Sequence, residues 1–520
     1  MRTAPAVYVT VACTLAAGLC SCTVGPDYRP PAIATPQRFE GASANPTLLD
    51  ASPRRASSPP GAGNPATAPA SPPSSAADAQ EDLSHWWARF RDPQLQRLIE
   101  QALSSNLDLK AAGARIRQAR EQEVIAGAAR LPTVNATGLG ANIHSNSNPL
   151  ASLQGKGGSS PGTGGSSGSP SGSGQSTDLK LYSAGFDASW ELDVFGGTRR
   201  SVEAARAASE AAVWQLRDAE VSLSAEVAVD YLTLATSRSR LALLHDAIQR
   251  DEQILELTEA RARAGFVSGL DVNEQRAQLA NESAQVPELE AQARAMAHAL
   301  AVLLGRPPEE MSGELAGVTR VPDIASELPP GLPSELLRRR PDIRQAERRL
   351  AGATAEIGVA VASLYPRFDL IAAASFAGDS LGNLLSSRNF ARIGAGLIRW
   401  PAFQGGKTRA NIRSTQEQRE QAYLAYQQSV LGALRDTEDA LVRVDAGQRR
   451  LRSLLEAQSA ASSSLSIARS QYEHGVTAFL DVLHAEMTLL DTQDQVEQTR
   501  LAVAQAHVSL FKALGGGWQP

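Results

Sequence analysis

Cysteine is nearly missing from this chain, and other residue classes are scarce enough to limit what the protein can do. The 520 residues include three cysteines, all within the first 22, so a disulfide framework is excluded for the remainder. Aromatic residues make up only 5 %, which suits closely packed helices better than a thick globular core. The net charge of −5 provides no basic surface for nucleic acid.

Catalytic motifs are missing as well. The seven histidines are scattered and form no metal-spaced cluster. No nucleophile elbow occurs, and the Gly-rich residues 155–174 lack the helical context of a phosphate-binding loop. We therefore expect no enzyme activity, no cofactor and no metal site.

The first residues are typical of a secretory signal, because a basic residue precedes a mostly apolar run from Ala4 to Leu19. The run ends in Leu19-Cys20-Ser21-Cys22, which resembles a lipoprotein signal box, where a small residue precedes the acylated cysteine. We expect a signal peptide over 1–21 and lipidation at Cys22; an ordinary signal peptide with incidental cysteines is the alternative. Thr23 replaces the aspartate that retains many lipoproteins at the inner membrane, so the outer membrane and its lipid are the expected location.

Proline, alanine and serine dominate the stretch that follows. Residues 22–82 cannot bury a core and are expected to form a lipidated N-terminal tether or an irregular wrap. Ordered structure is expected from about Leu83. One helix is then predicted from Pro93 to Arg130, with Asp92 as its N-cap.

Helix-breaking residues are absent from two very long segments. Thr198 to Ala264 contains no glycine and no proline over 67 residues, which as one helix is roughly 100 Å long. Lys407 to His474 lacks proline, although Gly432 and Gly447 interrupt it. A return helix is expected after each segment, and Pro287 should bend the first of them.

The chain repeats itself. The strand-to-helix turn Gly196-Gly197 recurs as Gly405-Gly406, each time after a strand-like segment and before a long helix-like one. Further matches keep fixed offsets: Asp108 with Asp342 at 234 (342 − 108), and the helix-turn tips Gly265 with Gly475 at 210 (475 − 265). A helix–strand–strand–helix–helix unit is therefore present twice, which predicts internal pseudosymmetry.

The repeat divides the chain into two halves and a Pro-rich connector. The expected ranges are 83–305 for the first half, 306–333 for the connector, 334–515 for the second half and 516–520 for a C-terminal tail. Strands are expected over about 133–143, 181–195, 366–377 and 390–401. The Gly/Ser-rich residues 145–176 should form a loop between the first two strands.

Apolar and polar residues alternate along these strands. In the second strand the apolar row is Phe186, Ala188, Trp190, Leu192 and Val194, and the acids between them are Asp187, Glu191 and Asp193. The third strand has an apolar row from Phe368 to Phe376, and Ile393, Ala395 and Leu397 mark the fourth. Such alternation fits either a sandwich strand on a core or a membrane barrel strand.

The barrel strand is the favoured interpretation. Nothing else in the sequence supplies a second sheet, and no segment after the signal has 18 consecutive apolar residues. Asp187, Glu191 and Asp193 would then face the lumen. Four strands cannot close a barrel, because the smallest membrane barrels have about eight, so several copies must contribute. Three copies would give twelve strands.

The duplicated unit, the paired Gly-Gly turns, the segment from Cys22 to Pro30 and the ending from Leu510 to Trp518 resemble the TolC/OprM/NodT outer membrane factors. The resemblance covers nearly everything from Cys22 to Trp518. It implies an α+β fold in which a homotrimer builds a 12-stranded β-barrel continued by a periplasmic α-helical barrel. It also implies partners: a periplasmic adaptor (membrane fusion protein) and an inner-membrane transporter, usually of the resistance–nodulation–division (RND) type. The loop 145–176 would then be extracellular.

In this family the periplasmic tip is closed by helix ends near the threefold axis, where Gly265 and Gly475 lie by resemblance. Asp271 and Asp481 follow each glycine by six residues, so six carboxylates per trimer would ring the aperture and attract cations. The alternative is that both aspartates cap the return helices. Tyr472 and His484 occupy positions where the family often has gate-linking or acidic residues, so His484 should make the gate less negative and pH-sensitive.

The expected function is passive conduction of drugs or other toxic small molecules across the outer membrane, as part of a tripartite efflux pump. Two other readings stay open. A duct for type I protein secretion would have the same fold. A periplasmic adaptor or structural lipoprotein would share the anchor and a helical hairpin, but not four amphipathic strands or a duplicated hairpin.

Overall fold

A computed structural model describes residues 23–32, 36, 39, 83–145, 177–322, 324 and 338–518. The signal peptide, Cys22, most of the 22–82 tether, the loop after residue 145 and much of the connector lie outside the described residues. The described residues form two units. The strand unit comprises 23–28, 120–145, 177–206 and 351–419; the helix unit comprises 29–32, 36, 39, 83–119, 207–322, 324, 338–350 and 420–518.

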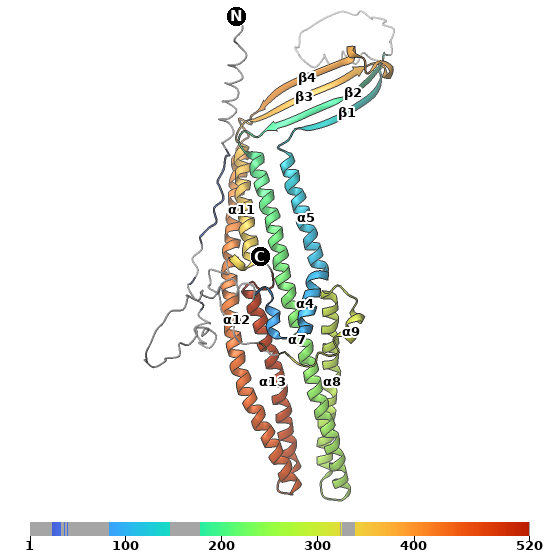
Figure 1. The fold of residues 1–520 in the computed structure, drawn as a ribbon, viewed down its shortest axis with the longest axis vertical. Coiled ribbons are helices and arrows are strands. Elements are labelled where there is room, and N and C mark those ends of the chain that lie inside the picture. Colours follow the sequence, from blue (N-terminus) through green and yellow to red (C-terminus); the bar gives the residue numbers. More distant parts are fainter. Residues whose placement is uncertain are drawn as a thin grey trace, which may run out of the picture. The chain divides into compact units, whose positions relative to one another are not determined.

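The elements follow one another in the order that the repeat predicts (Figure 1). In the first half they are η2 (Trp86–Phe90), α4 (Pro93–Ser105), α5 (Leu107–Ala128), β1 (Thr133–Ser145), β2 (Thr177–Leu192), α7 (Gly197–Arg263) and α8 (Gly269–Leu303). Then come η3 (Pro308–Glu310), α9 (Met311–Glu314), α11 (Pro341–Ala362), β3 (Arg367–Gly378), η4 (Leu381–Asn383), η5 (Ser387–Asn389), β4 (Phe390–Arg399), α12 (Lys407–Glu473) and α13 (Phe479–Ala513).

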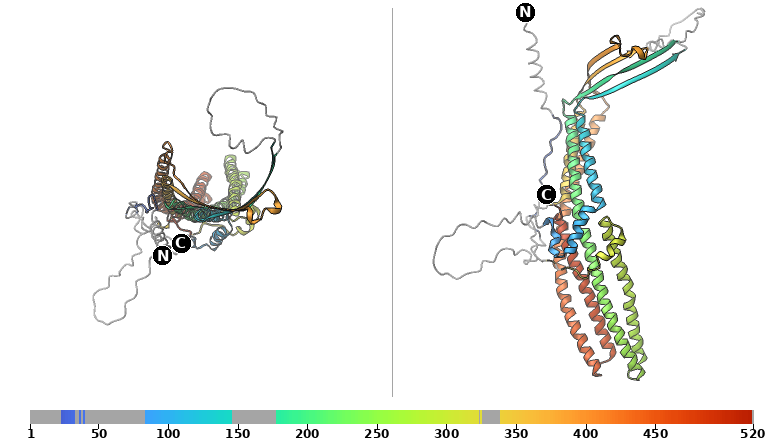
Figure 2. Two further views of the ribbon diagram at one scale, coloured as in Figure 1. Left: turned by 90° about the horizontal axis from the view of Figure 1, so that it is seen from above. Right: turned by 45° about the vertical axis from the view of Figure 1, so that its right-hand side comes forward.

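The four strands form one antiparallel sheet in the order β1-β2-β3-β4, which Figure 2 shows as a curved layer. The repeat is visible in its hydrogen bonds. The indole of Trp190 donates to the Arg130 carbonyl at 2.9 Å, and the indole of Trp400 donates to the Leu364 carbonyl at 3.1 Å. Each indole therefore ties the end of a strand to the end of the helix that precedes the strand pair.

The strand register assigns all odd-numbered strand residues to one face and all even-numbered ones to the other, because Thr133 pairs with Ser189, Ser189 with Ile371 and Ile371 with Ala395. The even face holds the predicted apolar rows of β2 and β3 side by side, with Phe186 opposite Ala374.

The apolar row of β4 does not follow them. Ile393, Ala395 and Leu397 lie on the odd face, and Leu397 pairs with Asp369. The reason is that β4 has apolar side chains on both faces: Ile398 on the even face pairs with Phe368, although that face also carries Arg392. Its alternation therefore could not indicate which face it shares with its neighbours.

The helix unit contains two long antiparallel hairpins, α7 from residue 207 with α8 and α12 from residue 420 with α13, whose turns lie at the same end (Figure 1). Both outgoing helices have 67 residues and both return helices have 35. Helix α8 contains Pro287, where we expected a bend, and α12 continues through Gly432 and Gly447, which interrupt the glycine-free pattern of the second half. A single glycine costs about 1 kcal/mol in a helix, which packing along so long a helix outweighs.

The two glycines of α12 differ in their surroundings, which predicts opposite responses to alanine. A Cβ at Gly432 has no described atom within 4 Å, whereas a Cβ at Gly447 would lie 2.9 Å from Cγ2 of Val503 on α13. We expect Gly432→Ala to raise the free energy of unfolding by about 0.5–1 kcal/mol. Gly447→Ala should lose that gain, because the β-branched Val503 has little rotamer freedom. Thermal denaturation of both variants tests this; equal stabilisation would contradict it.

The helix predicted from Pro93 to Arg130 is in fact two helices, which meet at Asn106. The Asn106 carboxamide accepts hydrogen bonds from the backbone N–H groups of Asp108 at 2.8 Å and Leu109 at 3.1 Å, so it caps α5. Its Nδ2 donates to the Leu303 carbonyl at the end of α8, at 2.9 Å. The break depends on a partner almost 200 residues away, which no local pattern indicates.

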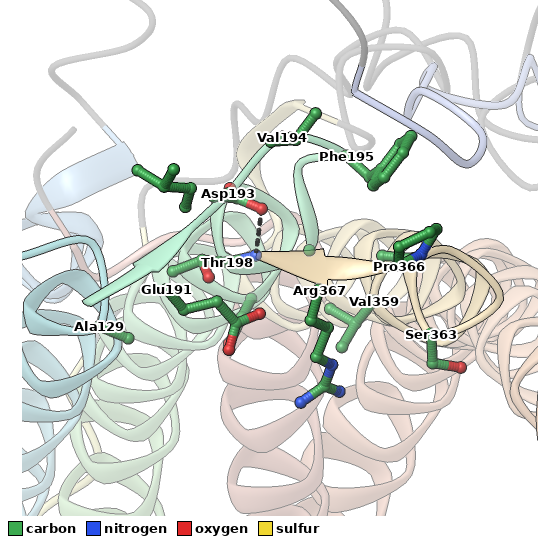
Figure 3. Close-up of a pocket in the computed structure, with 14 residues that line it drawn as sticks. Ala129, Glu191, Asp193, Val194, Phe195, Thr198, Val359, Ser363, Pro366 and Arg367 are labelled. Carbon is green, nitrogen blue, oxygen red and sulfur yellow. Dashed lines mark hydrogen bonds between the residues drawn. The ribbon is translucent and has the colours of Figure 1, made fainter. Parts of the chain in front are cut away.

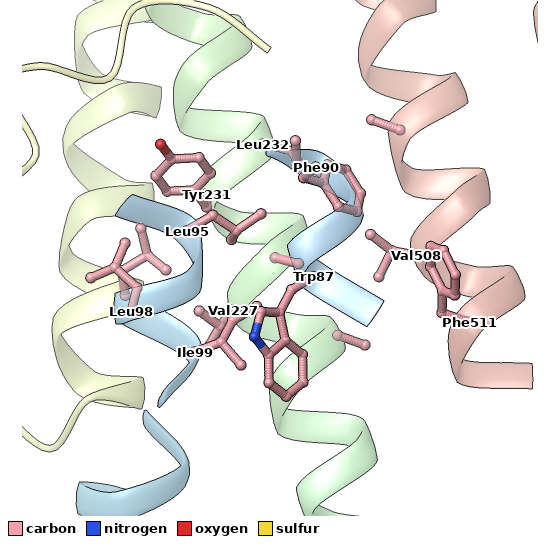
Figure 4. Packing of buried hydrophobic residues seen from close by; sticks show 14 of the residues in the cluster. Trp87, Phe90, Leu95, Leu98, Ile99, Val227, Tyr231, Leu232, Val508 and Phe511 are labelled. Atoms are coloured by element: carbon pink, nitrogen blue, oxygen red, sulfur yellow. The ribbon is translucent and has the colours of Figure 1, made fainter. Parts of the chain in front are cut away.

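The core of the helix unit is largely aliphatic, and its aromatic side chains gather where η2 meets α7 and α13 (Figure 4). Trp86 is 1 % exposed and stacks on Phe511 with ring centroids 5.2 Å apart. Phe90 packs edge-on against the same indole at 5.9 Å. Asp92 caps α4 as expected, accepting the N–H of Gln94 at 2.8 Å. The aromatic segment η2 is thus part of the buried core of the helix unit.

Candidate functional site

Both hairpins turn through the same backbone motif. The N–H of Gly265 donates to Ala262 at 3.0 Å, and the N–H of Phe266 donates to Arg261 at 2.9 Å. In the second hairpin the Gly475 N–H donates to Tyr472 at 3.0 Å and the Val476 N–H to Gln471 at 2.9 Å. The glycines have φ of 78° and 69°, a left-handed conformation that favours glycine. The two tips are thus built alike.

The return helices begin differently. Ser268 and Asp271 form a capping box on α8: the Ser268 hydroxyl accepts the Asp271 N–H, and the Asp271 carboxylate accepts the Ser268 N–H at 2.9 Å. At α13 the N-cap is Ala478, which has no capping side chain, and the Asp481 carboxylate instead accepts the Thr477 hydroxyl. Both aspartates therefore have structural partners in their own turn.

Tyr472 connects the two hairpins. Its ring lies 4.8 Å beneath the guanidinium of Arg261 on α7 and 5.7 Å from the Phe479 ring on α13. The Tyr472 hydroxyl is buried without a hydrogen-bond partner among the described residues. A cleft of about 250 Å³ runs beside this contact. Sequence reasoning selected Tyr472 but missed Arg261, whose only local signal is its place one turn before Gly265.

The outer surface of the tips is apolar at matching positions. Phe266 is 81 % exposed in the first turn, and its repeat equivalent Val476 is 74 % exposed. Leu270 and Leu480 are likewise exposed at the start of the return helices. His484 is exposed, one turn further along α13. Exposed apolar side chains gathered in this way are typical of protein interaction sites.

The strand-to-helix turn of the first half is a second site of interest (Figure 3). Asp193 lies beyond the last residue of β2 and caps α7, accepting the N–H groups of Thr198 at 3.1 Å and Arg199 at 2.9 Å. Gly196 packs closely on Thr23, while the equivalent turn at Gly405 and Gly406 has open space around it. The two turns share their glycines but not their caps.

The segment after Thr23, which we expected within the tether, packs onto this turn. Arg200 is 4 % exposed and donates to the Val24 carbonyl at 3.3 Å and to the Asp27 carboxylate at 2.6 Å. The Val24 N–H donates to the Phe195 carbonyl at 3.2 Å. Sequence reasoning did not single out Arg200, because nothing local marks it as a partner of residues more than 170 positions earlier.

Polar side chains gather on the odd face of the sheet. Asn135 donates to the Asp187 carboxylate at 3.0 Å, and Arg399 donates to Asp369 at 2.6 Å. Glu191 lies on the same face, opposite Asp369. The face therefore carries acids in β2 and a charged pair across β3 and β4.

In the described part of the chain, no helix is both long and apolar enough to cross a membrane. The described residues also contain no group of three or more histidine, cysteine or acidic side chains arranged to hold a metal ion.

Comparison with known proteins assigns the chain to one family. The family model described as "Outer membrane efflux protein" matches residues 98–306 and 332–516. The pyoverdine export outer membrane protein OpmQ of Pseudomonas aeruginosa is 34 % identical over 440 residues, which are 84 % of this chain and 88 % of that protein. Nodulation protein T of Rhizobium leguminosarum bv. trifolii is 29 % identical and the match covers 96 % of both chains.

The solved structure of the outer-membrane channel OprN has a TM-score of 0.79 to this chain at 33 % identity, over 96 % of this chain and 100 % of that one. The two matched ranges of the family model coincide with the two halves of the repeat. The chain belongs to the outer membrane efflux protein family, and is an outer membrane efflux channel and not an enzyme.

Proposed function

We propose that three copies of this chain form a channel-tunnel that conducts toxic small molecules out of the cell. The observation that carries the proposal is the exact duplication of the hairpin, with 67 outgoing and 35 returning residues in each copy. Two equal hairpins per chain would give a trimer six nearly equivalent ones, which suits a continuous periplasmic α-helical barrel.

The sheet supports the same assembly. β1 and β4 each pair with a single described strand, so each chain has two open sheet edges. Three sheets joined edge to edge would close a 12-stranded β-barrel with no free edge. The odd face, with Asp187 and Glu191, would line the lumen, and the even face, with Phe186 and Trp190, would contact lipid. Asp193 would lie at the lower rim, where it caps α7.

The tips are the surface that we assign to the partners. Phe266, Leu270, Val476 and Leu480 form two matching apolar pairs. A periplasmic adaptor that presents apolar helix ends would bury them, and an inner-membrane transporter, of RND type, would deliver the cargo through it. Lipidation at Cys22 would hold each copy in the outer membrane.

The tips would also be the gate. In a trimer, Asp271 and Asp481 would place six carboxylates around the aperture, and we expect Asp271→Ala with Asp481→Ala to raise bilayer conductance and change its response to divalent cations. The controls are Ser268→Ala and Thr477→Val, which remove the partners of these aspartates but keep their charge. If the control pair raises conductance equally, capping and not charge is responsible, and the ring is not part of the gate.

Deletion of the gene, followed by exposure to a panel of toxic compounds, tests the function. We expect increased sensitivity to small molecules, restored by the intact chain, and co-purification of an adaptor and an inner-membrane transporter with it. Unchanged sensitivity together with loss of a secreted protein would instead identify a protein-secretion duct and overturn the proposal.

A further inference from the structure

A buried carboxyl group lies between α7 and α8, about four helical turns from the tip. Asp251 is fully buried, and neither of its carboxyl oxygens has a hydrogen-bond partner among the described residues. Gln275 of α8 is also fully buried and donates to the backbone carbonyl of Asp251 at 3.3 Å. Its own side-chain oxygen has no described partner. An ionised carboxylate in such a place would be costly.

Two further acids face Asp251. Glu282 of α8 is 2 % exposed; one of its oxygens accepts from Gln278 at 2.7 Å, and the other has no described partner. Glu486 of α13 is 5 % exposed and is paired with Arg469 of α12 at 2.7 Å and with Arg250 of α7 at 3.8 Å. All four hairpin helices thus contribute a charged group.

The charges around Asp251 do not balance if every acid is ionised. Both arginines contact Glu486, so no described cation is bonded to Asp251 or to the free oxygen of Glu282. Burial, with the negative charges of Glu486 and Glu282, raises the pKa of Asp251 to about 7, against the smaller opposing effects of Gln275 and Arg250. Burial also raises the pKa of Glu282. The cluster therefore lacks a cation, and that cation must be small enough to fit at a fully buried site.

We propose that Asp251 and Glu282 bind a proton in the packed helix unit, and that loss of this proton loosens α8 and α13 from α7. A proton fits the observations better than a metal ion, because the described acids form no metal-holding group. The proton would be bound about 21 Å from the turn at Gly265, because 14 residues of α7 (265 − 251) separate Asp251 from that turn. It would act where the two hairpins meet.

The direction of the pH dependence follows from linkage. The packed form binds the proton more tightly than an unpacked form, in which Asp251 titrates near its ordinary value of 3.8. The stabilisation is complete below that pH and is lost as pH rises through about 7. For one proton, the ratio of packed to loosened hairpins falls by up to about tenfold per pH unit in between.

Infrared spectroscopy of the full-length protein in detergent tests the proton directly. The carbonyl stretch of a protonated carboxylic acid should be present at pH 6 and disappear on titration to pH 8. Asp251→Asn, the neutral isostere, should remove the part of that band that titrates near pH 7, whereas the part due to Asp230, whose pKa burial raises to about 6, should remain. Glu290→Gln is the control, because Glu290 lies on α8, the helix that carries Glu282, but is partly exposed and paired with Arg294 at 3.1 Å. It should leave the band unchanged.

A second readout follows the packing itself. Spin labels on the two tips should show a broader distance distribution at pH 8 than at pH 6, and Asp251→Asn should keep the narrow distribution at both. A band that is unaltered in Asp251→Asn, or a distribution independent of pH, would overturn the proposal. Should Asp251→Asn not fold, Glu282→Gln is measured in the same way. Neither readout requires conduction, so the result is independent of the proposed channel function.

Discussion

Trp86→Ala is expected to lower the free energy of unfolding by about 3–5 kcal/mol, the largest effect of any single substitution considered for the helix unit. The indole is 1 % exposed and touches three other aromatic rings, those of Trp87, Phe90 and Phe511. Its removal leaves a cavity that the surrounding rigid helices cannot fill. Thermal or urea denaturation followed by circular dichroism measures the change.

Trp86→Phe is the matched control. A phenyl ring keeps the stacking on Phe511, which lies 5.2 Å away, and loses only part of the buried volume. We expect a cost of about 1–2 kcal/mol. A loss below 1 kcal/mol for Trp86→Ala would show that the aromatic segment is not what organises this core.

Tyr472→Ala is expected to raise the open probability of the proposed gate by roughly 2- to 30-fold, which corresponds to a loss of about 0.5–2 kcal/mol of cation–π attraction. The ring contacts Arg261 on one hairpin and Phe479 on the other, so alanine removes both contacts at once. Single-channel recordings in planar bilayers measure the effect. Arg261→Ala should act in the same direction, because it removes the other half of the contact.

Tyr472→Phe distinguishes the ring from the hydroxyl. The hydroxyl has no described partner, so phenylalanine should leave conductance unchanged while keeping the ring under Arg261. An increase with phenylalanine equal to that with alanine would assign the closed state to a hydroxyl hydrogen bond made only in the assembled channel.

Much of the fold could be predicted from the sequence, because its strongest signals are long-range and repeated. A segment of 67 residues without glycine or proline predicts one helix, and α7 has that length. Gly265 and Gly475 predict the turns, since left-handed glycines close both helices. The apolar rows of β2 and β3 are confirmed to share a face.

The features that sequence reasoning missed or predicted wrongly depend on distant partners or on ambiguous patterns. The helix break at Asn106 requires the carbonyl of Leu303. The face of β4 could not be read because Ile393 and Ile398, which lie on opposite faces, are both apolar. Nothing in the sequence distinguishes Asp251 from other polar residues, and only the packing of α8 and α13 against α7 shows that its carboxyl group is inaccessible to solvent. Such features depend on which helix lies against which.

Because residues 23–28 pack on the strand unit, the position of the expected lipid attachment does not depend on the length of the Pro/Ala/Ser-rich insertion that follows. Arg200 holds Val24 and Asp27, so the chain is fixed within a few residues of the expected lipid attachment. Each residue spans at most about 3.6 Å, so a lipid on Cys22 would be held within a few ångströms of the fixed segment. The Pro/Ala/Ser-rich insertion begins only after this fixed point. Insertions or deletions in that stretch would therefore leave the expected lipid attachment at the same distance from the strand unit.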